Sequence, residues 1–365
     1  MRLVRTEALE AGMLLALPIL SSTGALLLRE DLALTERTIA LLKKQAVPFV
    51  YIRDRRFPDA AEEPLLRPET FRRALKELQD LFVTATAARG DHLPPERMER
   101  IQSVLRDILE DVFDRSDRLV LRFLALRGHD GYIFTHSALV ATTSLLLRQE
   151  LSFSYAQLYN LGLGALLHDL GMAAIPSEIV DKKGPLDGEE RFLVNLHPQG
   201  GWDLLAGHDL VWPTARIVAL QHHERWDGSG YPGGLREEEI HLFSRIVAVA
   251  DVYDALVSPR PYRPCRTPWE AHALILEGSG SLFDPRVVKA FFRVVAPYPV
   301  GTWLRLSTGH VGLVTAIPAE APHRPRMSLT FHPEMGKLAS PMVMPLAACE
   351  EIRITEVLEE EPNAV

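Results

Sequence analysis

The sequence HHERWDGSGYPGGL, from His222 to Leu235, combines two adjacent histidines with a loop rich in glycine. Helical periodicity surrounds this segment from Leu119 to about Ala296, and turn-rich loops break it at 182–188 and 227–234. Neither a βαβ alternation nor a glycine-rich nucleotide-binding motif accompanies it. The middle of the chain is therefore predicted to be helical, with this loop between two of its helices.

Side chains that can bind metals recur on both sides of the loop. Eight of the 13 histidines lie between His129 and His241. The candidate ligands, in chain order, are His136, His168, Asp169, His197, His222, His223 and Asp251. Imidazole and carboxylate suit Zn, Mn or Fe, and no thiolate accompanies them. A single buried histidine is most often a hydrogen-bonded core residue, but a whole series among apolar helices predicts a metal site.

The composition is that of a folded globular protein. Of 365 residues, 47% are hydrophobic and 24% are charged, which argues against a disordered or coiled-coil chain. The formal net charge of −8 argues against broad binding of DNA or anionic membranes. An anionic ligand would therefore need a local basic pocket or metal ions. Cys265 and Cys349 form neither a metal-type spacing nor a disulfide framework, which favours a reducing compartment.

One apolar stretch, from Ala11 to Leu28, has 18 residues without a charge and approaches the length of a membrane span. Pro18 and the turn residues from Ser21 to Gly24 divide it into two short runs, which favours a hairpin. Glu7 also does not suit the basic start of a signal peptide. We therefore expect no membrane span and a cytoplasmic protein.

The predicted fold class is mainly α, with an all-helical domain flanked by two smaller units. Residues 1–65 are expected to form a small α/β unit, with a helix near 35–45 and a strand near 48–52. Residues 66–118 form a helical connector, and 119–297 form the helical domain. Short alternating runs between glycine and proline turns predict a β-module over 298–365, ending in an acidic tail.

Several of these segments together resemble the HD-GYP family. They are HDLG (168–171), His197-Pro198, HHERWDGSGYPGGL (222–235), AVADVYDAL (248–256) and RPYR (260–263). The resemblance runs from about Ser116 to Ala296, and the flanking regions are similar more loosely. It implies a bacterial phosphodiesterase that hydrolyses cyclic di-GMP to linear pGpG, with further cleavage to GMP left open.

The resemblance also implies how the ligands are shared between two metal ions, with iron or manganese as the usual metals. His136, His168, Asp169 and Asp251 would hold one ion. Asp169 would bridge to a second ion that His197, His222 and His223 complete. Such a pair clamps a phosphoryl group and lowers the pKa of a bridging water to give the attacking hydroxide. Asp169 and His168 are thereby implied at the catalytic centre.

Substrate contacts are implied for the GYP loop and for two arginines. Tyr231 would stack on guanine, with Gly230 and Pro232 shaping the loop around it. Arg260 and Arg263 would face the dinucleotide phosphates, because guanidinium groups bind phosphate in a bidentate manner. The sequence alone leaves open a purely packing role for the tyrosine and a surface role for the arginines.

Two positions depart from the family pattern. Met172 replaces a lysine that lies near the substrate phosphate in the family, and this puts turnover in doubt. Tyr132 replaces a glutamate that some members associate with a third metal, which favours a binuclear site. Lys182 and Lys183 are candidates to restore the missing positive charge.

Three functions follow from this sequence. The first is cyclic di-GMP hydrolysis. The second is a metal-loaded receptor for a cyclic dinucleotide, or a docking module, with little turnover. The third is hydrolysis of the mixed cyclic GMP–AMP dinucleotide. Partners implied by the resemblance, besides cyclic di-GMP, are a diguanylate cyclase or another signalling protein at the GYP loop, and a second copy of the chain.

Overall fold

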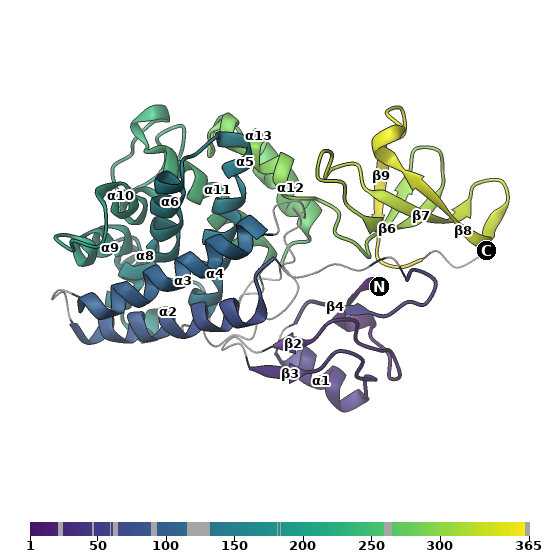
Figure 1. Cartoon of the computed structure of the whole chain (residues 1–365), viewed down its shortest axis with the longest axis horizontal. Helices are drawn as coiled ribbons and strands as arrows, with labels where there is room; N and C mark the ends of the chain where they lie inside the picture. The colour runs from purple at the N-terminus through teal and green to yellow at the C-terminus, as the bar shows by residue number, and fades with distance from the viewer. Residues whose placement is uncertain are drawn as a thin grey trace.

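The computed structural model describes residues 1–20, 25–45, 47–58, 60, 65–88, 93–114, 132–180, 182, 184–258 and 265–361. The fold is mainly α, as predicted, with a small antiparallel sheet near the C-terminus. Figure 1 shows the helices gathered at one end of the molecule and the sheet at the other. The predicted substrate residues Arg260 and Arg263, together with Lys183 and the boundary at 118–119, lie outside the described residues.

The helical part begins with a pair of long amphipathic helices and continues through shorter ones. Its helices are α2 (Pro68–Ala88), α3 (Pro95–Asp114), α4 (Tyr132–Leu146), α5 (Arg148–Leu151), α6 (Tyr155–Leu167), α7 (Ser177–Val180), α8 (Gly188–Val194), α9 (His197–Leu205), α10 (Pro213–Gln221), α11 (Leu242–Val257), α12 (Pro268–Glu277) and α13 (Pro285–Val294). Helices α2 and α3 pack together and bury leucine-rich faces, as their periodicity predicts. Helix α6 contacts α4, α10 and α11, which places the least polar helices at the centre.

The N-terminal unit contains a hairpin, a helix and a two-stranded sheet. Its elements are β1 (Arg2–Arg5), β2 (Ile19–Leu20), β3 (Leu26–Leu28), α1 (Glu36–Lys44) and β4 (Phe49–Ile52). The hairpin of β2 and β3 is confirmed, as are the predicted helix and the strand that follows it. Strand β1 pairs antiparallel with β4 and was not predicted from the sequence. Within the residues described, no helix is apolar and long enough to cross a membrane.

The C-terminal module is one antiparallel sheet whose strand order is β8-β7-β6-β5-β9. Its strands are β5 (Trp303–Leu306), β6 (Val311–Ala316), β7 (Arg326–His332), β8 (Gly336–Pro345) and β9 (Ile354–Leu358). Each strand overlaps one of the alternating runs of the sequence, although β8 begins before its run, which covers only 341–346. The buried side chains of β5 and β6 give this sheet an apolar face that needs a cover.

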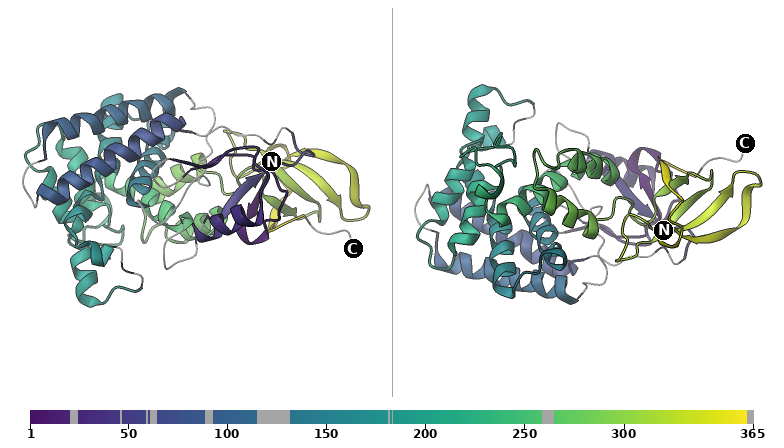
Figure 2. Two further views of the ribbon diagram at one scale, coloured as in Figure 1. Left: turned by 90° about the horizontal axis from the view of Figure 1, so that it is seen from below. Right: turned by 90° about the horizontal axis from the view of Figure 1, so that it is seen from above.

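The N-terminal unit provides that cover, and Figure 2 shows the two side by side. Side chains alternate along a strand, so the sheet of β1 and β4 can face two cores at once. Leu3 and Tyr51 lie opposite each other and pack in the core of the C-terminal module, with Trp303. The neighbouring pair, Val4 and Val50, belongs to the core that includes the helices. The unit thus joins the two ends of the molecule.

Candidate metal centre

The HD motif lies where α6 ends against α9. His168 directly follows α6 and caps its C-terminal end, and Asp169 precedes a short turn of helix at Leu170–Ala174. A side chain at Gly171 would lie 2.0 Å from the carbonyl oxygen of His197 and 2.4 Å from the amide nitrogen of Gly201. Only glycine permits this approach. The close contact brings His197, at the start of α9, to the HD motif.

The other candidate ligands come from three further elements. His136 lies in α4, His222 and His223 follow directly on α10, and Asp251 lies in α11. Their ligand atoms form two compact groups, in each of which all atoms lie within 4.8 Å of one another. The first group contains His136, His168 and Asp251, and the second contains Asp169, His197, His222 and His223. The seven residues predicted from the sequence are therefore brought together in space.

Asp169 lies between the two groups and presents one carboxylate oxygen to each. Its Oδ1 is 3.3 Å from His197 Nε2 and 3.5 Å from His222 Nε2. Its Oδ2 is 3.4 Å from His168 Nε2 and 3.9 Å from His136 Nε2. A carboxylate in this position can bridge two cations, as the resemblance implied.

The imidazoles are oriented so that one nitrogen of each ring faces the centre. His168 Nδ1 lies 2.8 Å from the carbonyl oxygen of Ala165, and His197 Nδ1 lies 2.6 Å from that of Val194. Nδ1 of His222 lies within 3.1 Å of two backbone carbonyl oxygens of α10. Each of these Nδ1 atoms therefore carries the proton and donates it, which leaves Nε2 as the free ligand atom.

The donor set fits divalent metal ions. The Nε2 atom of His168 is fully buried and has no hydrogen-bond partner among the residues that the structure describes. The Nε2 atoms of His197 and His222 converge at 3.2 Å, although each already uses its proton elsewhere. Buried nitrogen atoms without donors are costly unless a cation satisfies them. Nitrogen and oxygen ligands without sulfur suit iron and manganese and do not distinguish between them.

The electrostatics of the site affect its ligands differently. Burial would raise the pKa of Asp169, but His168, His197 and His222 outweigh burial and hold the pKa well below its usual range. Burial lowers the pKa of His222 and, more strongly, that of His223. The carboxylate is therefore ionised and these two imidazoles are neutral near pH 7. Despite burial, neighbouring carboxylates raise the pKa of His136 and of His197, so a cation must displace a proton to bind these two rings.

The GYP loop is held against the second group. The Tyr231 amide donates to the carbonyl oxygen of His223, and the two rings lie 4.8 Å apart between centroids. A side chain at Gly230 would lie 2.3 Å from the amide nitrogen of Arg225, so the loop can approach the histidine pair only with glycine there. Burial raises the pKa of the Tyr231 hydroxyl, which is thus a neutral phenol. Pro232 follows it and is exposed.

Two buried carboxylates beside the candidate ligands, Glu224 and Asp254, escaped the sequence analysis. Glu224 is 2% exposed and accepts hydrogen bonds from the amides of Gly233, at 2.6 Å, and Leu235, at 3.0 Å, so it anchors the loop. Asp254 is fully buried and lies 2.7 Å from His136 Nδ1. The signal for Asp254 was its position three residues after Asp251, which puts both on one face of α11.

The structure shows what surrounds Met172 and Tyr132, the two positions that depart from the family pattern, and the nearby Lys182. Met172 is half-buried and packs on the helical core. The Tyr132 ring stacks on His136, with 5.2 Å between ring centroids, and covers the side from which a further carboxylate would come. The ammonium group of Lys182 is bound by Glu190, so it is not free to replace the missing lysine.

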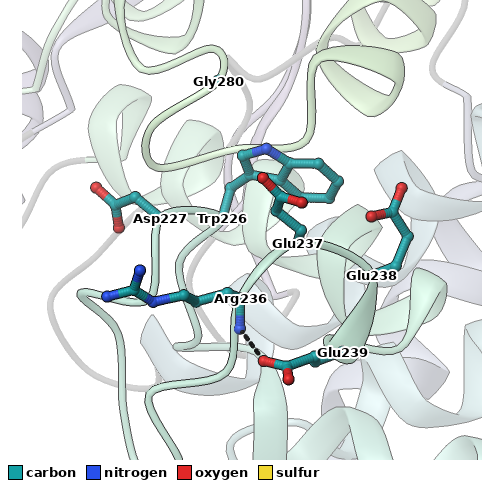
Figure 3. Close-up of a pocket in the computed structure, with 7 residues that line it drawn as sticks. All are labelled: Trp226, Asp227, Arg236, Glu237, Glu238, Glu239 and Gly280. Carbon is teal, nitrogen blue, oxygen red and sulfur yellow. Dashed lines mark hydrogen bonds between the residues drawn. The ribbon is translucent and has the colours of Figure 1, made fainter.

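A surface pocket of about 630 Å³ lies apart from these ligands (Figure 3). It is lined by Trp226, Asp227, Arg236, Glu237, Glu238, Glu239 and Gly280. With four carboxylates and one guanidinium it repels phosphate, and none of the seven candidate ligands lines it. We therefore assign the chemistry to the metal centre and not to this pocket.

Comparisons with known proteins identify the family to which the chain is similar. Residues 103–287 match the HD domain family. A cyclic di-GMP phosphodiesterase of Pseudomonas aeruginosa is 38% identical over 60% of this chain and 52% of its own length. A cyclic di-GMP phosphodiesterase response regulator of Xanthomonas campestris is 34% identical over 62% of this chain and 59% of its own length.

A third relative is named for a different cyclic dinucleotide. A 3'3'-cGAMP-specific phosphodiesterase of Vibrio cholerae is 37% identical over 34% of this chain and 24% of its own length. The matches to the first two relatives span only between about half and three fifths of those proteins. The family match at residues 103–287 includes all seven candidate ligands.

Proposed function

The chain belongs to the HD domain family, in its HD-GYP group, and on this basis we propose that it hydrolyses cyclic di-GMP to pGpG with two bound metal ions. The observation that carries the proposal is the position of Asp169, whose two oxygens face two separate groups of ligands. A mononuclear site would not need a carboxylate shared in this way.

When bound, two divalent cations supply a water of lowered pKa and polarise a phosphoryl oxygen. The chain's own residues prepare that chemistry. His168, His197 and His222 direct Nε2 inward because backbone carbonyls hold their Nδ1 protons. Asp169 is kept ionised by the same histidines. The site needs no nucleophilic side chain, because water provides the attacking oxygen.

For the substrate, we propose that Tyr231 stacks on one guanine at the edge of the centre, next to His223. Glu224 fixes the loop so that Gly230 and Pro232 shape the space beside the ring. Phosphate contacts are assigned to Arg260 and Arg263, by their resemblance to basic positions of the family. A protein partner at the loop and a second copy of the chain stay predictions.

The test is product analysis with the full chain. The protein is purified without oxygen, loaded with Mn²⁺ or Fe²⁺ and incubated with cyclic di-GMP, and the products are separated by chromatography. We expect pGpG, and we expect none from the Asp169→Ala variant. Dinucleotide that binds two-metal protein without being cleaved would support the receptor alternative that Met172 raises. Cleavage of 3'3'-cGAMP alone would replace the proposed substrate.

A further inference from the structure

The two ligand groups differ in how their histidines are held. Three of the rings, those of His168, His197 and His222, direct Nδ1 toward neutral backbone carbonyls. His136 instead directs Nδ1 toward the carboxylate of Asp254, at 2.7 Å. A carboxylate can only accept there, so the imidazole donates from Nδ1 and presents Nε2 toward Asp251, at 3.1 Å.

Asp254 is itself fixed in place. It is fully buried in α11, one helical turn after Asp251, so the two carboxylates flank the same imidazole from one helix. The Ser258 hydroxyl donates to Asp254 Oδ2 at 2.9 Å, and this is the oxygen that His136 contacts. The Tyr132 ring stacks on the other side of the imidazole. The ring orientation and the proton on Nδ1 are thus set before any cation arrives.

The negative charge is also divided unequally. The group with His136 contains Asp251, shares Asp169, and has Asp254 directly behind one ligand. The group with His197, His222 and His223 contains three imidazoles and the shared Asp169, and Asp251 reaches it only at its edge, with Oδ2 3.9 Å from His223 Nδ1. A hydrogen-bonded carboxylate makes an imidazole a stronger ligand, and further charge attracts a divalent cation.

We propose that Asp254 is a positioning residue that makes the His136 group the tighter of two unequal metal sites, so that this site fills first. The inference rests on the two-metal centre of the proposed function. It adds an order of loading to that function and assigns the order to one buried carboxylate that touches no cation itself.

The experiment is a titration of the metal-free full chain with Mn²⁺ alone, in which the free ion is followed by its electron paramagnetic resonance signal. The wild-type chain should bind two ions in two resolved steps. In the Asp254→Asn variant the dissociation constant of the tight step should rise about 10–100-fold, while the weak step stays within about twofold. Asp111→Asn is the matched control, because Asp111 is an equally buried carboxylate that pairs with Arg67 in another part of the fold.

A general loosening of the structure would weaken both steps together, so the selectivity separates a positioning role from a structural one. Equal weakening of both steps, or an unchanged tight step, in a folded Asp254→Asn protein would overturn the inference. If that variant does not fold, Ser258→Ala decides, because it keeps the carboxylate but removes its hydroxyl donor. The tight step must then weaken selectively, and an unchanged tight step overturns the inference. No dinucleotide is present, so failure to cleave cyclic di-GMP leaves this result intact.

Discussion

The two apolar cores bury very different polar groups. The helical core encloses imidazoles and carboxylates that face one another, as in the chain of contacts through Asp251, His136 and Asp254. In the described part of the C-terminal module, the buried polar residues are Thr302, Thr315, Ser328 and Thr330. These carry hydroxyls only, and one of them, Thr315, donates to a backbone carbonyl oxygen.

The difference in buried polar groups distinguishes a core that only packs from a core that can hold a reactive centre. A hydroxyl is easily satisfied by nearby backbone, whereas buried ionisable groups are unfavourable unless they are paired or bind a cation. The helical core gathers ionisable groups that face one another around Asp169 and Asp251, and elsewhere it pairs isolated ones, as Asp111 with Arg67. We infer that the second core joins the N-terminal unit to the sheet, while the first is built to hold metal ions. The following predictions test that division.

The largest effect is expected from Asp169→Ala. Loss of the shared carboxylate should empty at least one metal site and lower cyclic di-GMP hydrolysis by at least about 10³-fold, more than the loss of one preorganised donor. Metal analysis after gel filtration and product chromatography measure both effects. Two metals per chain in this variant would show that Asp169 does not bridge.

Trp303→Ala tests the core of the C-terminal module. Trp303 is 2% exposed and packs edge-on against Phe57, so its truncation should lower the free energy of unfolding by about 3–5 kcal/mol. The metal content of the folded protein should stay at the wild-type value. Denaturant titration and metal analysis test this pair of results, and loss of metal from the folded variant would mean that the two cores are not independent.

Met172→Lys tests the departure from the family pattern inside the first core. Met172 lies three residues after Asp169 and is half-buried, so a lysine there can return a cation to the vicinity of the phosphate. We expect kcat to rise by about tenfold, less than the ~10²–10³ that a fully preorganised donor contributes. Steady-state kinetics with equal metal loading is the measurement. An unchanged or lower kcat would show that this position does not limit the reaction.

The smallest effect concerns His272, a buried histidine of the helical core that faces aromatic rings and not carboxylates. Burial lowers the pKa of His272 to about 3, and Tyr253 and Phe292 surround the ring. The unfolded chain binds this proton near pH 6.5 and the folded chain does not, so the stabilising contribution is present above pH 6.5 and is lost as pH falls toward 3.

Substitution of His272 by leucine should therefore reduce the acid sensitivity of unfolding. The wild-type free energy of unfolding should fall by about 1 kcal/mol more than that of the variant between pH 7 and pH 5.5. Denaturant titration of both metal-free proteins at the two pH values gives the difference. Parallel pH profiles would contradict a neutral buried imidazole at this position.

The sequence was most informative where a residue type in a given setting points to one role, as histidine within apolar helices points to a metal ligand. Histidines and aspartates within apolar helices identified all seven members of the two ligand groups, and the alternating runs identified the strands of the module. Asp254 and Glu224 were missed because their roles depend on which groups packing brings opposite them. Strand β1 is only four residues long, and its pairing with β4 is a long-range contact that local pattern does not report.

The packing of the N-terminal unit on the C-terminal module could not be predicted from local sequence pattern either. It depends on the two faces of one short sheet, as at Leu3 and Val4, which pack in different cores. The sequence contains the alternation, but it does not say which partner covers each face. Substrate contacts at Arg260 and Arg263 rest on the family resemblance, because these residues lie outside the described part of the chain.

The most direct test of a shared carboxylate is the electron paramagnetic resonance spectrum of the full chain loaded with two Mn²⁺ ions. Ions bridged by Asp169 would lie about 3.5–4 Å apart and interact magnetically. The account predicts the multiline spectrum of a coupled pair, which disappears in Asp169→Ala. Two bound ions that give only the superposed spectra of isolated Mn²⁺ would contradict it.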